Sequence, residues 1–143
     1  MTRYVLDTNV ISEPLRPDPS EAALGWIARQ DPETLFLTTT VIGEIAVGIE
    51  KIRGRGDSCA RLDRWLHRIV HEDFVGRILT YDIEAALLYG QLLAAAHASG
   101  RQPTVGDAQI AAVARREGMA VATRNVRDYE PLGVTVVDPW QFG

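Results

Sequence analysis

Four acidic residues that are far apart in the chain occupy positions where carboxylates could act together. They are Asp7, Glu44, Asp107 and Asp128. Converging carboxylates repel one another and raise one another's pKa values, and a hard divalent cation relieves that repulsion. Ligation by oxygen alone, with no Cys or His nearby in the sequence, suits Mg²⁺ or Mn²⁺. Such a site commonly activates water against a phosphodiester.

Each acid also has a purely local interpretation, which the sequence leaves open. Asp7 is placed to form an Asx turn or to cap a following helix. Glu44 is placed to interact with the N-terminus of its own helix. The segment from Thr104 to Asp107 resembles a capping box with Asp in place of Glu. Asp128 can simply solvate a turn.

The predicted strands and helices make the joint pattern more informative than any single acid. Short apolar runs alternate with longer helical runs, which is typical of an α/β fold with a parallel sheet. We expect strands at residues 4–6, 35–38, 77–80, 120–123 and 134–137. We expect helices at residues 20–30 and from 41 to 51 or 53. A third helix begins at Ser58 and includes Ile69, and two more span residues 82–99 and 104–117.

These elements bring the acids toward one edge of the sheet. Asp7 and Asp128 follow strands, and Glu44 lies early in the helix after a strand. In an open parallel sheet, ligands bind outside the carboxyl ends of the strands. Asp107 reaches that edge if the helix from Ile83 returns the chain and residues 100–103 reverse it. The sequence therefore predicts that the four carboxylates converge.

Composition places the chain among ordinary globular proteins. It has 143 residues, 46% hydrophobic and 24% charged, and we expect one domain over residues 1–143. The net charge of −4 argues against a non-specific nucleic-acid coat. The single cysteine, Cys59, excludes an internal disulfide framework. No signal peptide is visible and the most apolar stretch is too short to span a bilayer, so we expect a cytoplasmic protein without a membrane partner.

Motifs around the four acids resemble those of PIN domains. They are Val5-Leu6-Asp7-Thr8-Asn9, Gly43-Glu44, Gly106-Asp107-Ala108 with Ile110-Ala111-Ala112, and Ala122-Thr123-Arg124-Asn125 with Asp128. The resemblance covers residues 4–137. The single-domain size and the run Thr-Arg-Asn-Val-Arg-Asp are similar to the VapC toxins of type II toxin–antitoxin pairs, especially the FitB-like subgroup.

This resemblance implies an α/β fold, a PIN-like three-layer α/β/α sandwich with a central, mainly parallel sheet of four to five strands. It implies a Mg²⁺- or Mn²⁺-dependent ribonuclease in which Asp7 and Asp107 ligate the ion directly, while Glu44 and Asp128 ligate through water or hold a second ion. Polar positions that support such a site are matched by Thr8, Asn9, Thr123 and Asn125. The implied partners are an RNA substrate, a cognate antitoxin that often carries a DNA-binding domain, and a second copy in a homodimer or dimer of dimers.

One segment of this acidic chain is locally positive. Residues 51–71 contain six basic residues against two acids. They could guide an RNA backbone toward the carboxylates through Arg53, Arg55, Arg61, Arg64 and Arg68. An exposed polar helix pair explains the same residues about as well. His67 and His71 share a helix face with Asp63, and we interpret that face as solvated rather than as a transition-metal site.

Other functions compete with a nuclease. A phosphatase or receiver domain also places Asp after its first strand, but Asp7-Thr8-Asn9 lacks a second carboxylate and Lys51 is the only lysine. A nucleotide binder would need a Gly-rich loop after the first strand, which this chain lacks. The main alternative is a catalytically weak PIN-fold binding protein that acts through a DNA-binding antitoxin. The helix from Ile83 is apolar nearly all round, so we expect it in the core or in an interface.

Overall fold

A five-stranded sheet forms the centre of the protein. The structure, a computed structural model, describes residues 1–55 and 58–142. The strands are β1 (Tyr4–Leu6), β2 (Leu35–Thr38), β3 (Ile78–Leu79), β4 (Ala120–Ala122) and β5 (Val136–Val137). They are ordered β3-β2-β1-β4-β5, and every described pairing is parallel. The predicted α/β class and parallel sheet are therefore confirmed, although β3 and β5 are each two residues long.

The strand order places the ends of β1 and β4 beside each other. The chain moves outward from β1 to β2 and β3, then returns to the other side of β1 for β4 and β5. Leu6 is in register with Ala122, and the Asp7 amide donates to the Ala122 carbonyl at 2.9 Å. Such a reversal of strand order is where open parallel sheets bind ligands. The residues that follow β1 and β4 thus meet at the switch point.

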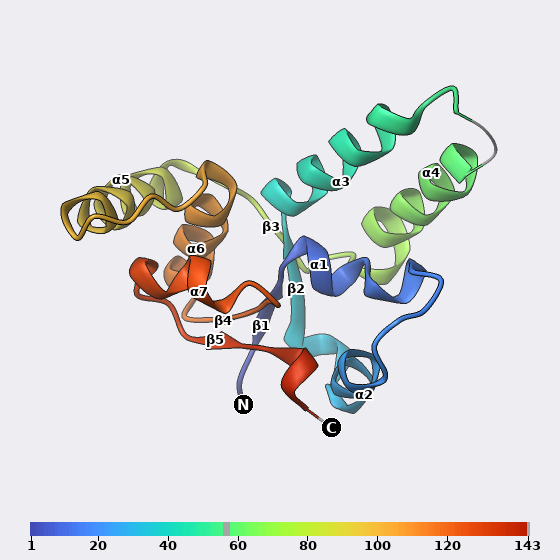
Figure 1. Cartoon of the computed structure of the whole chain (residues 1–143), viewed down its shortest axis with the longest axis horizontal. Helices are drawn as coiled ribbons and strands as arrows, with labels where there is room; N and C mark the ends of the chain where they lie inside the picture. Colours follow the sequence, from blue (N-terminus) through green and yellow to red (C-terminus); the bar gives the residue numbers. More distant parts are fainter. Residues whose placement is uncertain (56–57, 143) are drawn as a thin grey trace.

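Helices cover the sheet on two sides (Figure 1). Helices α5 and α6 lie on one side, with the short α7 near them, and α1 to α4 lie on the other. The bounds are α1 (Thr8–Ile11), α2 (Glu21–Arg29), α3 (Thr39–Ile52), α4 (Ser58–Arg68), α5 (Ile83–Ala98), α6 (Val105–Glu117) and α7 (Val126–Tyr129). This arrangement is the predicted three-layer α/β/α sandwich.

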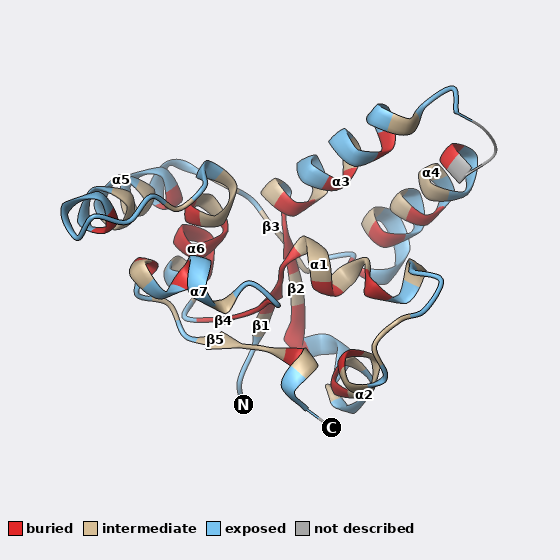
Figure 2. Cartoon of the chain, viewed as in Figure 1, coloured by how far each residue is buried: buried red, intermediate tan, exposed pale blue. Residues whose placement is uncertain are grey.

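The core lies between the central strands and α6 (Figure 2). Val5, Leu37 and Val121 have no exposed surface, and every residue of α6 from Ile110 to Ala114 is buried as well. Helix α6 contacts β1 and β4 and also packs along α5. Its many alanines let α6 fit closely between α5 and the sheet. The first turn of α6 is consequently held at a fixed place relative to β1.

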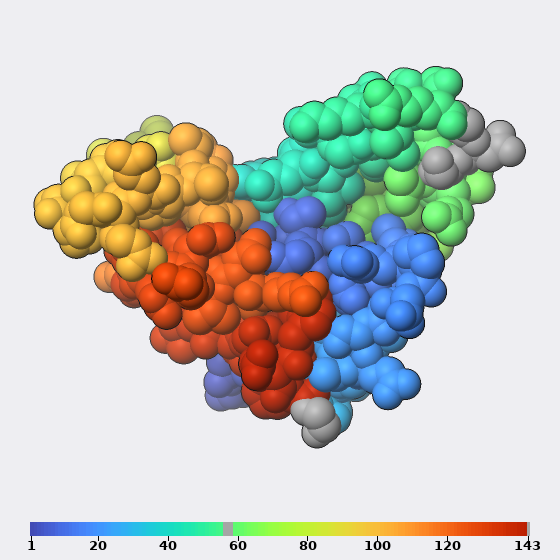
Figure 3. Space-filling model, in the orientation of Figure 1, coloured from blue at the N-terminus to red at the C-terminus, as the bar shows by residue number. Residues whose placement is uncertain are grey.

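The molecule is hollowed between two groups of helices (Figure 3). One rim of the hollow is α5 and the other is α3 with α4, while α1 lies near its base. Helix α3 contacts both α1 and α6. The hollow therefore opens above the place where these three helices meet.

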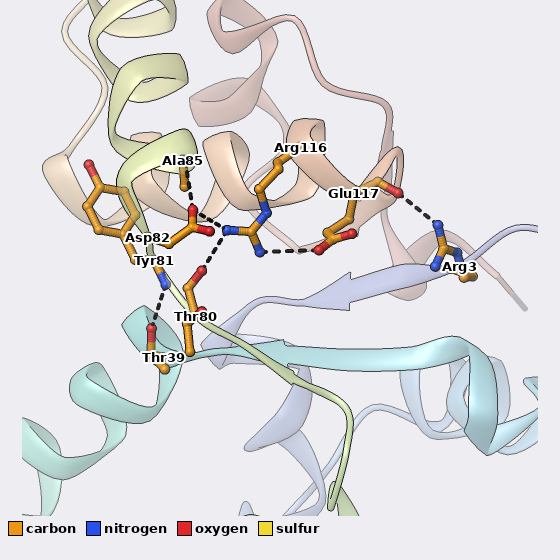
Figure 4. Close-up of polar contacts among 8 residues, drawn as sticks. All are labelled: Arg3, Thr39, Thr80, Tyr81, Asp82, Ala85, Arg116 and Glu117. Atoms are coloured by element: carbon orange, nitrogen blue, oxygen red, sulfur yellow. Dashed lines mark hydrogen bonds and ion pairs between the residues drawn. The ribbon is translucent and has the colours of Figure 1, made fainter.

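Arg116 fixes the start of α5 against the end of α6 (Figure 4). Its side chain is 8% exposed, and its guanidinium donates to the Thr80 carbonyl at 2.8 Å and to Asp82 Oδ1 at 2.6 Å. Asp82 in turn caps α5 by accepting from the Ala85 amide. The Tyr81 amide donates to Thr39 Oγ1, which ties the same loop to the first turn of α3. This network sets α3, α5 and α6 relative to one another.

Several short elements differ from the sequence prediction. Helices α1 and α7 have four residues each, too few to show a helical period in the sequence. Thr38 caps α3 by accepting from the Val41 amide, so that helix begins at Thr39, two residues earlier than predicted. After α4 the chain continues as a π-helix, Ile69–Asp73, whose i→i+5 bond is made by the Phe74 amide.

Helix α5 lies on the outside of the sandwich, so of the two places predicted for it, the core is excluded and an interface is left. Only Ala85 and Ala96 are buried in it, whereas Ile83 is 81% and Leu87 is 67% exposed. The partner helix α6 occupies the central position instead, because its small residues fit there. The alternative prediction, that α5 forms an interface, stays a prediction. Within the described residues no helix has the length and apolarity needed to cross a membrane.

Candidate active site

Asp7 is the buried centre of the candidate site. It follows β1, is 4% exposed, and caps α1 by accepting the Thr8 amide on Oδ1 at 2.8 Å. Its Oδ2 accepts from Thr123 Oγ1 at 2.8 Å and from the Tyr129 hydroxyl at 3.2 Å. Burial raises the pKa of Asp7, and these hydrogen bonds oppose the rise. The local capping interpretation is thus correct for Asp7 but accounts for only one of its oxygens.

Thr123 is held in place by two of the predicted supporting residues. Its Oγ1 accepts from the Asn9 side-chain amide at 3.4 Å and from the Asn125 main-chain amide at 3.0 Å. Asn9 Oδ1 accepts from the Arg124 amide at 3.1 Å, which joins the loop after β4 to α1. Asn125 thus acts through its backbone. Because its Oγ1 takes these two donors, the Thr123 hydroxyl hydrogen points at Asp7.

Tyr129 is the site residue that the sequence did not reveal. It ends α7, has no exposed surface, and its hydroxyl donates to Asp7 Oδ2 at 3.2 Å. A phenol has one hydrogen to donate, and here it goes to Asp7. Burial raises the pKa of Tyr129, which keeps it protonated. In the sequence, a tyrosine after Asp128 resembles an ordinary core aromatic, because its hydroxyl partner lies 122 positions away.

Asp107 lies in the first turn of α6, across Tyr129 from Asp7. Its amide donates to Thr104 Oγ1 at 3.1 Å, so the Thr half of the predicted capping motif is present. Burial, and then the charge of Asp7, raise the pKa of Asp107 to about 6. If Asp107 served only as a helix cap, the N-terminus of α6 would stabilise its charged form and lower its pKa. Burial and the neighbouring carboxylates thus disfavour the charged form of Asp107.

Glu44 reaches the site from the second turn of α3. Thr8 Oγ1 donates to Glu44 Oε1 at 2.9 Å, and Oε2 lies against Gly106 in the first turn of α6. Partial burial raises the pKa of Glu44, and the charge of Asp7 adds to the rise. The carboxylate thus lies between Thr8 and Gly106, each of which is the sequence neighbour of another acid of the group. This geometry goes beyond the local interpretation of Glu44.

Asp128, like Glu44, is exposed. It lies in α7 and its charge raises the pKa values of Asp7 and Asp107. It also lines a small cavity of about 100 Å³ with Arg101, Gln102, Pro103 and Pro131. Three elements that follow strands, together with α6, therefore bring the other three acids within electrostatic reach of Asp7.

The donor chemistry of this cluster fits a hard divalent cation. Its side chains offer only oxygen, and in the described residues no Arg or Lys forms an ion pair with any of the four acids. Three of the pKa values are raised because burial is not compensated by positive charge. Among the described residues, no three ligating side chains are arranged closely enough to hold an ion as they stand. These carboxylates would therefore have to move closer together to hold an ion.

The predicted RNA-contacting arginines lie apart from the acids, on α4 and at the end of α3. Arg53 is paired with Glu50 at 2.7 Å and with Asp63 at 3.0 Å, and Arg68 with Asp73 at 3.5 Å. The others predicted to contact RNA are exposed: Arg55, Arg61 and Arg64. The exposed rings of His67 and His71 are 4.5 Å apart, and in the described residues no third ligand completes a metal site with them.

Comparison with known proteins places the chain in a family. The PIN domain model matches residues 4–130. The chain belongs to the PIN-domain family. It is 39% identical over 139 residues to plasmid stability protein StbB of Pseudomonas syringae pv. tomato, across 96% of this chain and 98% of that protein. It is 36% identical to VapC ribonuclease Y4jK of Sinorhizobium fredii, across 96% and 97%.

A solved structure of FitAB bound to an IR36 DNA fragment resembles this PIN domain closely. The TM-score is 0.91 at 33% sequence identity, over 98% of this chain and 97% of the matched chain. The predicted resemblance to VapC and FitB-like PIN domains is therefore confirmed. The likeness extends through the strands and helices that carry the four acids.

Proposed function

We propose that this PIN domain is a divalent-metal-dependent ribonuclease and the toxin of a toxin–antitoxin pair. The observation that carries the proposal is the group of carboxylates around the buried Asp7: its charge raises the pKa values of Asp107 and Glu44, the charge of Asp128 raises that of Asp7, and in the described residues no Arg or Lys forms an ion pair with any of the four. The similar VapC ribonuclease and the FitAB–DNA complex support the assignment of the pair. The direct test is cleavage of RNA by purified protein with Mg²⁺ or Mn²⁺, and its loss in EDTA.

The chain's own residues suggest a division of labour. Asp7 and Asp107 would hold the ion directly, and Glu44 and Asp128 would hold it through water or hold a second ion. Thr123, Tyr129 and the Thr8 amide fix the Asp7 carboxylate, so that little orientational freedom is lost on binding. When bound, a divalent ion would lower the pKa of a water molecule and neutralise charge on the scissile phosphate. The hollow above α1, α3 and α6 gives an RNA strand access to this place.

Metal binding should stabilise the protein. Saturating Mn²⁺ or Mg²⁺ adds RT ln(1 + [L]/Kd) to the free energy of unfolding, about 2.7 kcal/mol at one hundred times Kd. For a domain of this size that corresponds to a rise in Tm of roughly 5–10 °C. Calorimetric melting of EDTA-treated protein, with and without each ion, measures the rise. Glu44→Gln should reduce it, and a Tm indifferent to both ions would contradict the metallonuclease assignment.

The exposed arginines of α4 test how RNA approaches. If Arg61 and Arg64 contact backbone phosphates, replacing both with Gln should raise KM about tenfold at low salt and change kcat little. The slope of log KM against log salt should fall by about 1.4, because each single-strand phosphate contact contributes about 0.7. Arg29→Gln, on the remote α2, is the control. Unchanged KM would show that the α4 segment is only a solvated face.

A catalytically weak binding protein is the second candidate. Both oxygens of Asp7 accept hydrogen bonds from the protein, and among the described residues no three ligating side chains are arranged to hold an ion. Both observations are compatible with this candidate. The two candidates differ in one measurement: induced expression should arrest growth and degrade RNA only if the protein is a nuclease. If the protein is a nuclease, co-expression of the product of the adjacent reading frame should relieve the arrest. If it is a binding protein, the same product should form a DNA-binding complex with it. The predicted homodimer and cytoplasmic location remain predictions.

A further inference from the structure

Gly106 is a glycine whose backbone does not require one. It is the second residue of α6, directly before Asp107, and its conformation is helical. The glycines with positive φ in the described residues are at positions 54, 76, 100, 118 and 133, so Gly106 is not among them. Glycine is a poorer helix former than alanine at such a position. Another feature of the structure must therefore account for the missing side chain.

That feature is the carboxylate of Glu44. A Cβ built on Gly106 would lie 2.9 Å from Glu44 Oε2 and 3.6 Å from Glu44 Cδ. Among the glycines of the described residues, this is the closest approach to any heavy atom. A separation below about 3.0 Å between Cβ and oxygen is inside van der Waals contact, so any side chain here would force the carboxylate to move.

The helices themselves are not free to separate and make room. Thr40 Oγ1 donates to Gln109 Oε1 at 3.1 Å, one turn from the contact on each helix, and it joins α3 directly to α6. Tyr81 and Thr39 tie the start of α3 to the loop that Arg116 binds (Figure 4). The free end of Glu44 is thus the part that would give way.

Displacement of that carboxylate would disturb its second contact as well. Glu44 Oε1 accepts from Thr8 Oγ1 at 2.9 Å, so the carboxylate spans the gap between α1 and α6. Its two contact residues, Thr8 and Gly106, directly adjoin Asp7 and Asp107 in the sequence. The absence of a side chain at position 106 therefore lets Glu44 stand beside both central acids.

We infer that Gly106 is a positioning residue, which holds open the space where the Glu44 carboxylate sits between α1 and the first turn of α6. Its consequence for metal binding rests on the proposed function, but its geometry does not. Gly106 thus acts on the Glu44 carboxylate and does not itself contact a substrate or ion.

The variant Gly106→Ala tests this inference. We expect its Tm without metal to equal or exceed that of the wild type, since only a flexible side-chain end must yield and alanine favours the helix. In its crystal structure the Thr8 Oγ1–Glu44 Oε1 distance should exceed 3.5 Å. Its Kd for Mn²⁺, measured by calorimetry, should be about tenfold weaker, as for other residues that orient metal ligands.

Two further proteins separate positioning from a general effect. Gly90→Ala, in α5, adds a Cβ with no heavy atom within 4 Å and should leave the Mn²⁺ affinity unchanged. In a Glu44→Ala background, Gly106→Ala should have no further effect on that affinity, because the group it displaces is gone. An equal tenfold loss in that background would overturn the inference.

The crystal structure decides the geometry independently of function. If Gly106→Ala kept the Thr8–Glu44 hydrogen bond at its wild-type length, the inference would be wrong. If the wild-type protein failed to bind Mn²⁺, the proposed metallonuclease would be contradicted, while a displaced Glu44 carboxylate in the variant would still establish the positioning role.

Discussion

Replacing Asp107 with Asn should abolish RNA cleavage while leaving the fold intact. The change removes one of the two carboxylates that we expect to hold the ion directly, a group whose charged form is already penalised by burial and by Asp7. A fall in kcat/KM of about a thousandfold or more corresponds to about 4 kcal/mol of transition-state stabilisation. Asp7→Asn should have the same effect on activity. Cleavage is measured on a labelled RNA with saturating Mn²⁺, together with circular dichroism to verify folding.

The metal-free stability of the same variant distinguishes a ligand from a structural acid. Because burial and Asp7 penalise the charged form of Asp107, an amide there should raise Tm by a few degrees in EDTA, for about 1 kcal/mol. Asp18→Asn, at an exposed position, is the matched control and should change neither activity nor Tm. A folded Asp107→Asn protein with wild-type ribonuclease activity would exclude the role we assign to this residue.

Much of the fold could be predicted because each element carries its own local signal. The apolar runs at residues 4–6 and 35–38, and the caps Ser20, Asp82 and Thr104, mark strands and helices without knowledge of distant contacts. The parallel order of the strands then brings the residues after β1 and β4 together. The four acids could therefore be chosen by their positions after strands and at helix starts.

The finer features of the site depend on pairs of residues that no local pattern connects. Tyr129 has the sequence environment of a core aromatic, and only its burial beneath Asp7 reveals the use of its hydroxyl. Gly106 resembles a weak point in a helix until Glu44 is seen against it. The burial of α6 rather than α5 was equally hidden, since α5 is the more apolar helix in sequence and α6 has the smaller side chains.

Removing the metal should make the stability of the protein depend on pH with an unusual sign. Asp107 has a folded pKa of about 6 against an ordinary value of 3.8, so the folded chain binds this proton more tightly than the unfolded chain. The resulting stabilisation is complete below about pH 4 and is lost as the pH rises through about 6. The difference of about two between the folded and unfolded pKa values of Asp107 corresponds to about 3 kcal/mol. Because Asp107 is only half-buried, we expect about 1 kcal/mol after solvent screening.

The bound ion should reverse this dependence. Protons compete with the cation for the carboxylates, so the Mn²⁺ affinity should fall about tenfold for each pH unit below 6 if one proton is displaced. In saturating Mn²⁺ the protein should therefore gain stability between pH 5 and pH 7, where the metal-free protein loses it. Melting curves across this range, in EDTA and in Mn²⁺, give both slopes.

The difference between the wild type and Asp107→Asn isolates the group responsible. Asp7 and Glu44 also have raised pKa values and contribute to the wild-type slope, but they remain in the variant, as do all the surface groups that govern acid unfolding. Subtracting the two stability curves in EDTA should leave the titration of Asp107 together with its reciprocal effect on Asp7, with a midpoint between the unfolded and folded pKa values of Asp107. A difference that is flat between pH 4 and pH 7 would mean that Asp107 carries no penalty for its charge, and the electrostatic argument for a cation beside it would fail.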